Sequence, residues 1–192
     1  MVPVADTTKV TITNVAYSVE NLLAIKDAAA ADVKIVLQAA ANPQLVGSVD
    51  DLTAALADIT YSGAITLSEP LTAANLADVL ALTTGKVTAD VSGTAAALVT
   101  ALEAEKTVNA LTVTLDLAAV DASDLKILDA KTSVTVDASL VTSITGTAAE
   151  LKTVLNAAGI DTPANVAVTV DGKVSAADLN TIAKATGGVV TA

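Results

Sequence analysis

The chain lacks several side chains on which enzyme sites and binding sites are commonly built. Its 192 residues include no His, Cys, Trp, Phe or Arg. The absence of His and Cys excludes an imidazole base, a thiolate nucleophile and the usual nitrogen and sulfur ligands of zinc or iron. The absence of Arg excludes the bidentate recognition of phosphate or carboxylate. These absences favour a protein that is not an enzyme.

The charge balance is strongly acidic. Ten basic residues stand against 21 acidic ones, which gives a formal net charge of -11 at pH 7. A charge of this sign repels the phosphate backbone, and two tyrosines, Tyr17 and Tyr61, are too few to form a stacking platform for bases. The sequence therefore predicts no nucleic-acid partner, and we expect both tyrosines in packing positions near helix or strand ends.

Long apolar runs are also missing. The chain is 53% hydrophobic and its mean hydropathy is +0.64. Asp, Lys and Gly nevertheless interrupt the apolar residues before any run reaches the roughly 20 residues that span a bilayer. The first ten residues have no basic start followed by an apolar stretch, so no signal peptide is visible. The sequence predicts no insertion into a membrane.

The chain does contain a repeated phrase: a small polar residue, two spacers, usually a polar residue, and then Leu. The phrase occurs seven times, with starts 22 to 30 residues apart. Self-similarity at such a period is typical of repeat architectures. The seven copies are Ser18–Leu22, Ser48–Leu52, Thr72–Leu76, Thr94–Leu98, Asp121–Leu125, Thr147–Leu151 and Ser175–Leu179.

Each copy of the phrase predicts the start of a helix. Ser, Thr or Asp in its first position accepts a hydrogen bond from a free amide of the first turn, and the polar residue three positions later bonds back or favours the positive end of the helix dipole. Apolar residues follow at helical spacing, as in Leu151, Val154 and Leu155. We expect seven short helices of about ten to twelve residues.

Short β-branched or alternating runs between these helices predict strands of about three to five residues. Strands that alternate with helices need crossover connections, which make the strands parallel. The expected strands are Val10–Thr13, Val33–Leu37, Ala64–Leu67, Val87–Ala89, Leu111–Leu115, Val134–Val136, Val166–Val170 and Val189–Thr191.

The fold class is therefore α/β, and two architectures satisfy the pattern. One is a right-handed α/β solenoid of about seven strand–helix units, with one parallel sheet and a row of short helices. The other is a doubly wound parallel sheet. We favour the solenoid because every unit repeats the same phrase with small changes in length. We expect a single repeat domain over residues 1–192, with units that start near residues 9, 38, 63, 86, 111, 133 and 166.

The wording of the repeats is similar to that of a known group of proteins. Val141–Leu151, Ala176–Ile182 and Thr83–Ala89 resemble the Ala-, Thr-, Val- and Asp-rich tandem repeats of very large bacterial, especially cyanobacterial, secreted and cell-surface proteins of the S-layer-like or haemolysin type. The resemblance covers the chain from about residue 45 to its end and implies a structural or adhesive segment. The calcium-binding nonapeptide of the haemolysin type is absent, so no calcium ligand is carried over.

One stretch, Asp171–Asp178, copies the second half of a calcium loop, with an Asp, a Gly and a later acid. The first two ligand positions would be Ala167 and Thr169, which offer no carboxylate. A strand followed by a capped helix explains the stretch better, so we assign no metal ligand to it.

Paired acids form a second kind of candidate site. Asp50 with Asp51, and Asp121 with Asp124, bring two carboxylates together as a hydrolase does. All four lie at predicted helix starts, where capping and the helix dipole favour acids. We assign no catalytic residue and no cofactor site.

Threonines at alternate strand positions suggest an ice-binding solenoid as a further alternative. Thr11 and Thr13 lie in one expected strand, and Thr112 and Thr114 lie in another. A second column of threonines would not be continuous, because the remaining strands each carry one such polar residue: Lys34, Thr66, Thr88, Thr135 and Thr169. Thr is also common in strands generally, so its presence there is weak evidence for ice binding.

Composition and repeats together predict a structural segment that acts as a rigid spacer. The resemblance implies that this segment is a spacer or adhesive stalk of a large secreted or cell-surface protein. The alternative from another class is a module that binds a protein or a glycan. The expected partners are neighbouring repeats, or a second copy of the chain through the solenoid ends, where a parallel strand is exposed. We expect Met1–Thr8 to cap one end and Val189–Ala192 to leave the other uncapped.

Overall fold

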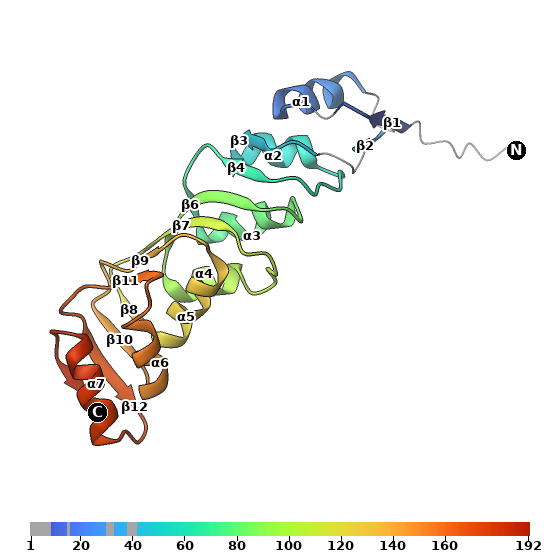
Figure 1. Ribbon diagram of the computed structural model, residues 1–192. Helices are drawn as coiled ribbons and strands as arrows, with labels where there is room; N and C mark the ends of the chain where they lie inside the picture. The colour runs from blue at the N-terminus through green and yellow to red at the C-terminus, as the bar shows by residue number, and fades with distance from the viewer. Residues whose placement is uncertain (1–8, 15, 30–32, 38–41) are drawn as a thin grey trace, which may run out of the picture. The chain divides into compact units, whose positions relative to one another are not determined.

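The computed structural model describes residues 9–14, 16–29, 33–37 and 42–192 (Figure 1). The chain forms two compact units. Unit 1 comprises Met1–Glu69 and Asp78–Thr88, and unit 2 comprises Pro70–Ala77 and Ala89–Ala192. The expected cap Met1–Thr8 and the expected unit start near residue 38 lie outside the described residues. The single repeat domain over residues 1–192 stays a prediction.

Seven helices are present in the described part of the chain, and each follows the first residue of one repeated phrase. This confirms the predicted helix starts, although the helices are 7 to 10 residues long and so are often shorter than expected. The helices are α1 (Val19–Ala28), α2 (Val49–Leu56), α3 (Ala73–Ala81), α4 (Ala95–Ala101), α5 (Ala122–Lys131), α6 (Ala148–Val154) and α7 (Ala176–Ala185).

The helix starts use the capping chemistry that the phrase predicts. At α6, the Thr147 hydroxyl accepts a hydrogen bond from the Glu150 amide, and the Glu150 carboxylate accepts one from the Thr147 amide at 3.0 Å. Ser18 and Asn21 form the same reciprocal capping box at α1. Asp121 is an exception, because its side chain makes no capping hydrogen bond at α5.

Thirteen strands are present in the same described residues, and the nine pairings whose register the structure gives are all parallel. The structure is therefore of the α/β class with parallel sheets, as predicted. The strands are β1 (Lys9–Ile12), β2 (Lys34–Leu37), β3 (Leu45–Gly47), β4 (Ile65–Leu67), β5 (Leu71–Thr72), β6 (Val87–Gly93), β7 (Ala110–Leu115), β8 (Ala119–Asp121), β9 (Val136–Asp137), β10 (Ser143–Thr147), β11 (Ile160–Asp161), β12 (Ala167–Asp171) and β13 (Val190–Thr191).

The prediction of one parallel sheet is wrong, because the described strands form three sheets. Several repeats contribute two strands, one after the preceding helix and one that runs directly into the next helix. At Asp121 and Thr147 the last residue of the strand is also the N-cap of the helix. We use the word coil below for the stretch from one repeated phrase to the next.

In unit 1, α1 packs on α2 and the parallel strands stack their apolar residues in columns. Leu45, Ile65 and Val87 stand opposite one another on β3, β4 and β6, and each is at most 1% exposed. Tyr17 and Tyr61 are buried beside these elements. Their predicted packing positions are confirmed.

In unit 2, β8, β10, β12 and β13 form one sheet, and α4, α5, α6 and α7 contact one another in succession. Ser143 lies opposite both Ala119 and Ala167, so the strand register advances by 24 residues at each of these two steps. The buried column of the sheet contains Ile144 and Val168, which are at most 1% exposed. The stacking is thus regular in register.

The leucine that ends each repeated phrase lies at the centre of the coil's core. Six of the seven leucines are 0% exposed: Leu22, Leu52, Leu76, Leu98, Leu125 and Leu151. The seventh, Leu179 of α7, is only half-buried.

Candidate interaction surfaces

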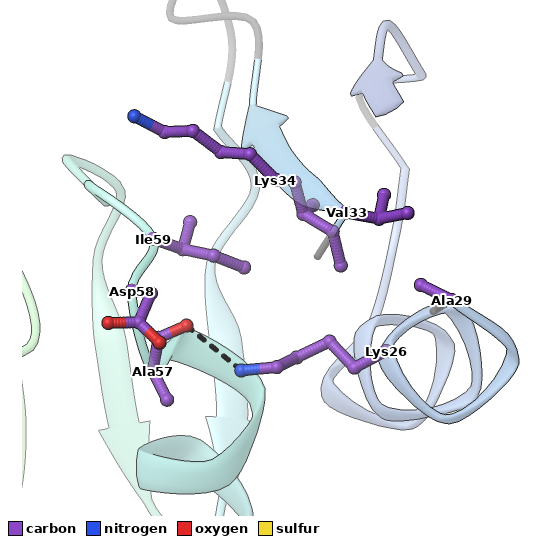
Figure 2. Close-up of a pocket in the computed structure, with 8 residues that line it drawn as sticks. Lys26, Ala29, Val33, Lys34, Ala57, Asp58 and Ile59 are labelled. Carbon is purple, nitrogen blue, oxygen red and sulfur yellow. Dashed lines mark hydrogen bonds between the residues drawn. The ribbon is translucent and has the colours of Figure 1, made fainter. Parts of the chain in front are cut away.

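A hollow of about 180 Å³ in unit 1 lies where α1, β2 and the end of α2 meet (Figure 2). The Lys26 side chain reaches from α1 to α2, and its Nζ donates to the carbonyl oxygens of Ala54 at 2.7 Å and Ala57 at 2.9 Å. These carbonyls belong to the end of α2, where no further helical amide is available to bind them. The ammonium therefore supports the negative end of the α2 dipole.

The turn after α2 shapes the same hollow. Asp58 has a φ of 63°, in the left-handed region that commonly ends a helix. Lys34 also lines the hollow but points away from Lys26 (Figure 2). The ammonium group of Lys26 is thus bound to the carbonyl oxygens at the end of α2, so Lys26 has a structural role in this hollow.

A second hollow, of about 200 Å³ in unit 2, brings together the acids that the sequence paired. It is lined by Asp121 and Asp124 and by the start of α4 at Thr94. Burial, and secondarily the charge of Asp121, raise the pKa of the Asp124 carboxyl above its ordinary value. Because the chain contains no His, Cys or Arg, the pair has none of these groups beside it to activate a nucleophile or bind an anion.

The other candidate acids take part in helix capping. Asp51 accepts a hydrogen bond from the Ser48 hydroxyl at 2.8 Å. Asp178, the last acid of the calcium-like stretch, binds the Ser175 hydroxyl with one carboxylate oxygen at 2.9 Å and the Lys152 ammonium with the other. These hydrogen bonds, that of Lys152 first, lower the pKa of Asp178. Both carboxylate oxygens of Asp178 are thus already engaged by side chains of the protein.

No group of three or more His, Cys, Asp or Glu side chains in residues 9–14, 16–29, 33–37 and 42–192 is arranged to hold a metal ion. Within the same ranges, no helix is long and apolar enough to cross a membrane.

The outward threonines form one short column. Thr145, Thr169 and Thr191 stand opposite one another on β10, β12 and β13, and Asp121 occupies the next position on β8. Elsewhere the column is interrupted: Thr114 lies opposite Asp137, Thr66 lies opposite Val46 and Thr88, Thr11 lies opposite Val36, and Lys34 lies opposite Lys9.

Two faces of the chain are apolar and incompletely covered. The first lies on α1 and the end of β1, and forms a hollow of about 460 Å³ lined by Ile12, Asn14, Ala16, Tyr17, Asn21, Ala24, Ile25 and Ala28. The second lies on α7 and β13, where Leu179 and Val190 are half-buried and Val189 is 73% exposed. We call them the α1 face and the α7 face.

In three coils a buried threonine links the coil to the one before it, and the sequence pattern did not predict this role. The hydroxyls of Thr83, Thr132 and Thr186 donate to carbonyl oxygens 20 or 21 residues earlier, at 2.7, 2.7 and 2.6 Å. Each hydroxyl also accepts from the amide two residues later. We call them the corner threonines. The recurrence of Thr at the end of a helix was the available signal.

The coils approach closely at these corners. A Cβ at Gly85 would collide with the carbonyl oxygens of Ser62 and Gly63, and a Cβ at Gly188 would collide with that of Val166. Glycine is needed at both positions because the backbone of the preceding coil occupies the space of a side chain.

No protein-family model matches the chain, and no curated protein or solved structure is similar to it.

Proposed function

We propose that the chain is a structural repeat segment: a right-handed α/β solenoid that acts as a rigid spacer or adhesive stalk in a large secreted or cell-surface protein. Its mechanism is mechanical. Each coil packs on its neighbours, so the stability is approximately a sum over similar coils and interfaces, and the length grows with the number of coils.

The observation that carries this proposal is that the contacts between coils repeat with the sequence. The phrase leucine is fully buried in six coils, and the corner threonine bonds to the preceding coil in three. Interactions of this kind join neighbours in sequence and need no unique central core. They support a solenoid over a doubly wound sheet, in which each strand has a distinct position.

The polar groups of the candidate sites support a structural role as well. The Lys26 ammonium and the Asp51 and Asp178 carboxylates serve helix ends. The remaining support for a secreted or surface location is the resemblance of the repeats to those of large bacterial surface proteins.

The proposal is tested by lengthening the chain by one coil. Duplication of 143–166 inserts one register step of unit 2. We expect small-angle scattering to show a maximum dimension longer by about 5 Å, the spacing of adjacent strands, and we expect the unfolding temperature to rise because one stacking interface is added.

A matched control inserts 24 Gly and Ser residues after Gly172, which has nothing within 4 Å of its Cβ position. This variant adds the same mass without a stacking interface, so its unfolding temperature should not rise. A duplicated chain that melts no higher than this control contradicts the proposal.

A further inference from the structure

The α1 face and the α7 face are the two complementary sides of one kind of interface. When the repeated phrases are aligned on their N-caps, Ser18 and Ser175, Leu22 matches Leu179 and Ile25 matches Ile182. Leu22 and Ile182 are 0% exposed, whereas Leu179 and Ile25 are half-buried. Each helix therefore buries one of the two positions and leaves the other incompletely covered.

The neighbours of these helices explain which position is covered. Helix α1 packs on α2, the next helix along the chain, and α7 packs on α6, the preceding helix. The phrase leucine therefore belongs to the side that a following coil covers, and the isoleucine belongs to the side that a preceding coil covers. Among the described residues, no coil follows against the α7 face and none precedes against the α1 face.

The polar residues of the two faces are compatible with contact. At the step from α6 to α7, Lys152 of one helix binds Asp178 of the next. The positions that correspond to them at the open faces are Asn180 of α7 and Asn21 of α1. Two neutral amides can bind each other as donor and acceptor, so this contact has no like-charge repulsion.

The strands beside the two faces are also available on one side. In the described pairings, β13 is bound to β12 alone and β1 is bound to β2 alone. The pairings of β1 with β2 and of β12 with β13 are parallel, so β1 of another molecule is able to follow β13 in the same direction. An unpaired strand edge is a template for this kind of addition.

We propose that the α7 face of one molecule stacks on the α1 face of a second copy of the chain, head to tail. The inference rests on the proposed function, since it continues between molecules the stacking of coils within one. The interface joins two different surfaces, and such heterologous contacts build open linear assemblies when their geometry does not close into a ring.

The experiment is sedimentation velocity of the full chain over a series of concentrations, with one blocking variant for each face. Leu179→Lys places a charge on the α7 face, and Ile25→Lys places one on the α1 face. For the unaltered chain we expect the average mass to rise with concentration. Each variant alone should stay monomeric, because a desolvated charge weakens such a contact by at least about tenfold.

The decisive step is to mix the two variants. Leu179→Lys retains its α1 face and Ile25→Lys retains its α7 face, so an equal mixture should form a dimer and no larger species. Ile127→Lys, at an exposed position of α5 that is 39% accessible, is the control and should assemble like the unaltered chain. Circular dichroism and melting establish that each variant is folded.

Two results overturn the inference. One is an unaltered chain that stays monomeric at every concentration. The other is assembly that Leu179→Lys abolishes but Ile25→Lys leaves intact, which would indicate pairing of two α7 faces. Either result leaves the proposed function standing, because the lengthening test is performed on monomers and measures stacking within one chain.

Discussion

Helices α6 and α7 begin alike and end up in different environments. Thr147 and Ser175 cap them through the same hydrogen bond to the third amide of the helix. Leu151 and Leu179 follow at the same position of the phrase, yet Leu151 is 0% exposed and Leu179 is half-buried. The difference shows that a coil forms its helix from local sequence but completes its core with the coil that follows.

The corner threonines show the opposite dependence. Thr132 in an inner coil and Thr186 in the last coil are both 7% exposed, and both donate to a carbonyl oxygen of the preceding coil. Because this contact needs only the earlier neighbour, the last coil makes it in full. The burial of the phrase leucine thus depends on the following coil, whereas the hydrogen bond of the corner threonine depends on the preceding coil.

The largest expected effect distinguishes Leu151 from Leu179. Leu151→Ala removes a side chain with no exposed surface and should lower the free energy of unfolding by about 3 to 4 kcal/mol, whereas Leu179→Ala should lower it by roughly 1 kcal/mol, since water already reaches that side chain. Urea denaturation followed by circular dichroism measures both, at concentrations where the chain is monomeric. Equal losses would show that Leu179 is as well packed as Leu151.

A smaller effect is expected at the corner threonines, and it should be present in both coils. Thr132→Val and Thr186→Val keep the side-chain volume but leave a buried carbonyl oxygen and a partly buried amide without the hydroxyl, at a cost of about 1 to 3 kcal/mol each. Thr132→Val should cost more, because the Leu111 amide also donates to the Thr132 hydroxyl. Thr135→Val, at an exposed position of the same region, should change stability little. If Thr186→Val changes stability as little as Thr135→Val does, the last coil is not anchored as its hydrogen bonds indicate.

The smallest effect concerns the pH dependence of the contact between α6 and α7. The pKa of Asp178 is lowered from an ordinary value of 3.8 by its hydrogen bonds to Lys152 and Ser175. A carboxyl whose pKa is lower in the folded state stabilises that state above its ordinary pKa, and this contribution is lost as the pH falls through the lowered value. Asp178→Asn should therefore reduce the loss of stability below pH 3.8.

Asp124 should behave in the opposite sense. Burial and the charge of Asp121 raise its pKa above the ordinary value, so its contribution to stability falls as the pH rises from 3.8 through the raised value. Asp124→Asn should remove that decline. Melting temperatures measured from about pH 2 to 7 follow both variants, with Asp50→Asn as a control at an exposed carboxyl. Parallel pH profiles for the two variants would contradict the assignment of opposite shifts.

The helix starts were predictable because their causes are local. A capping side chain, the amide it binds and the acid that bonds back lie within four residues, as at Ser18 and Thr147. Strands such as β7 were predictable for a similar reason, since alternating β-branched residues favour an extended backbone that is buried on one face.

The strands that run directly into helices were not predicted. β8 and β10 end on Asp121 and Thr147, which the sequence pattern assigned only to the helix starts. β10 also contains Gly146, where a Cβ would come within 2.8 Å of the Ala122 side chain. Glycine is favoured at this position because Ala122 of the preceding strand–helix step leaves no room for a side chain. The residues of the segment itself do not reveal that contact.

The surfaces were predictable in part. The sequence located the acids and indicated that capping occupies them, which the contacts of Asp51 and Asp178 confirm. It paired Asp121 with Asp124, and the structure places both in one hollow. The α1 face was not anticipated, since Ile25 has the same apolar character as its buried counterpart Ile182.

The sequence by itself determined the α/β class, the seven helix starts and the parallel sense of the strands, because each depends on interactions within a few residues or on the need for a crossover. The tertiary structure alone decided that the strands divide among three sheets and that Leu179 differs from six identical leucines. Burial is a property of the neighbours that surround a side chain, and a repeated phrase is the same whether or not a neighbour lies against it.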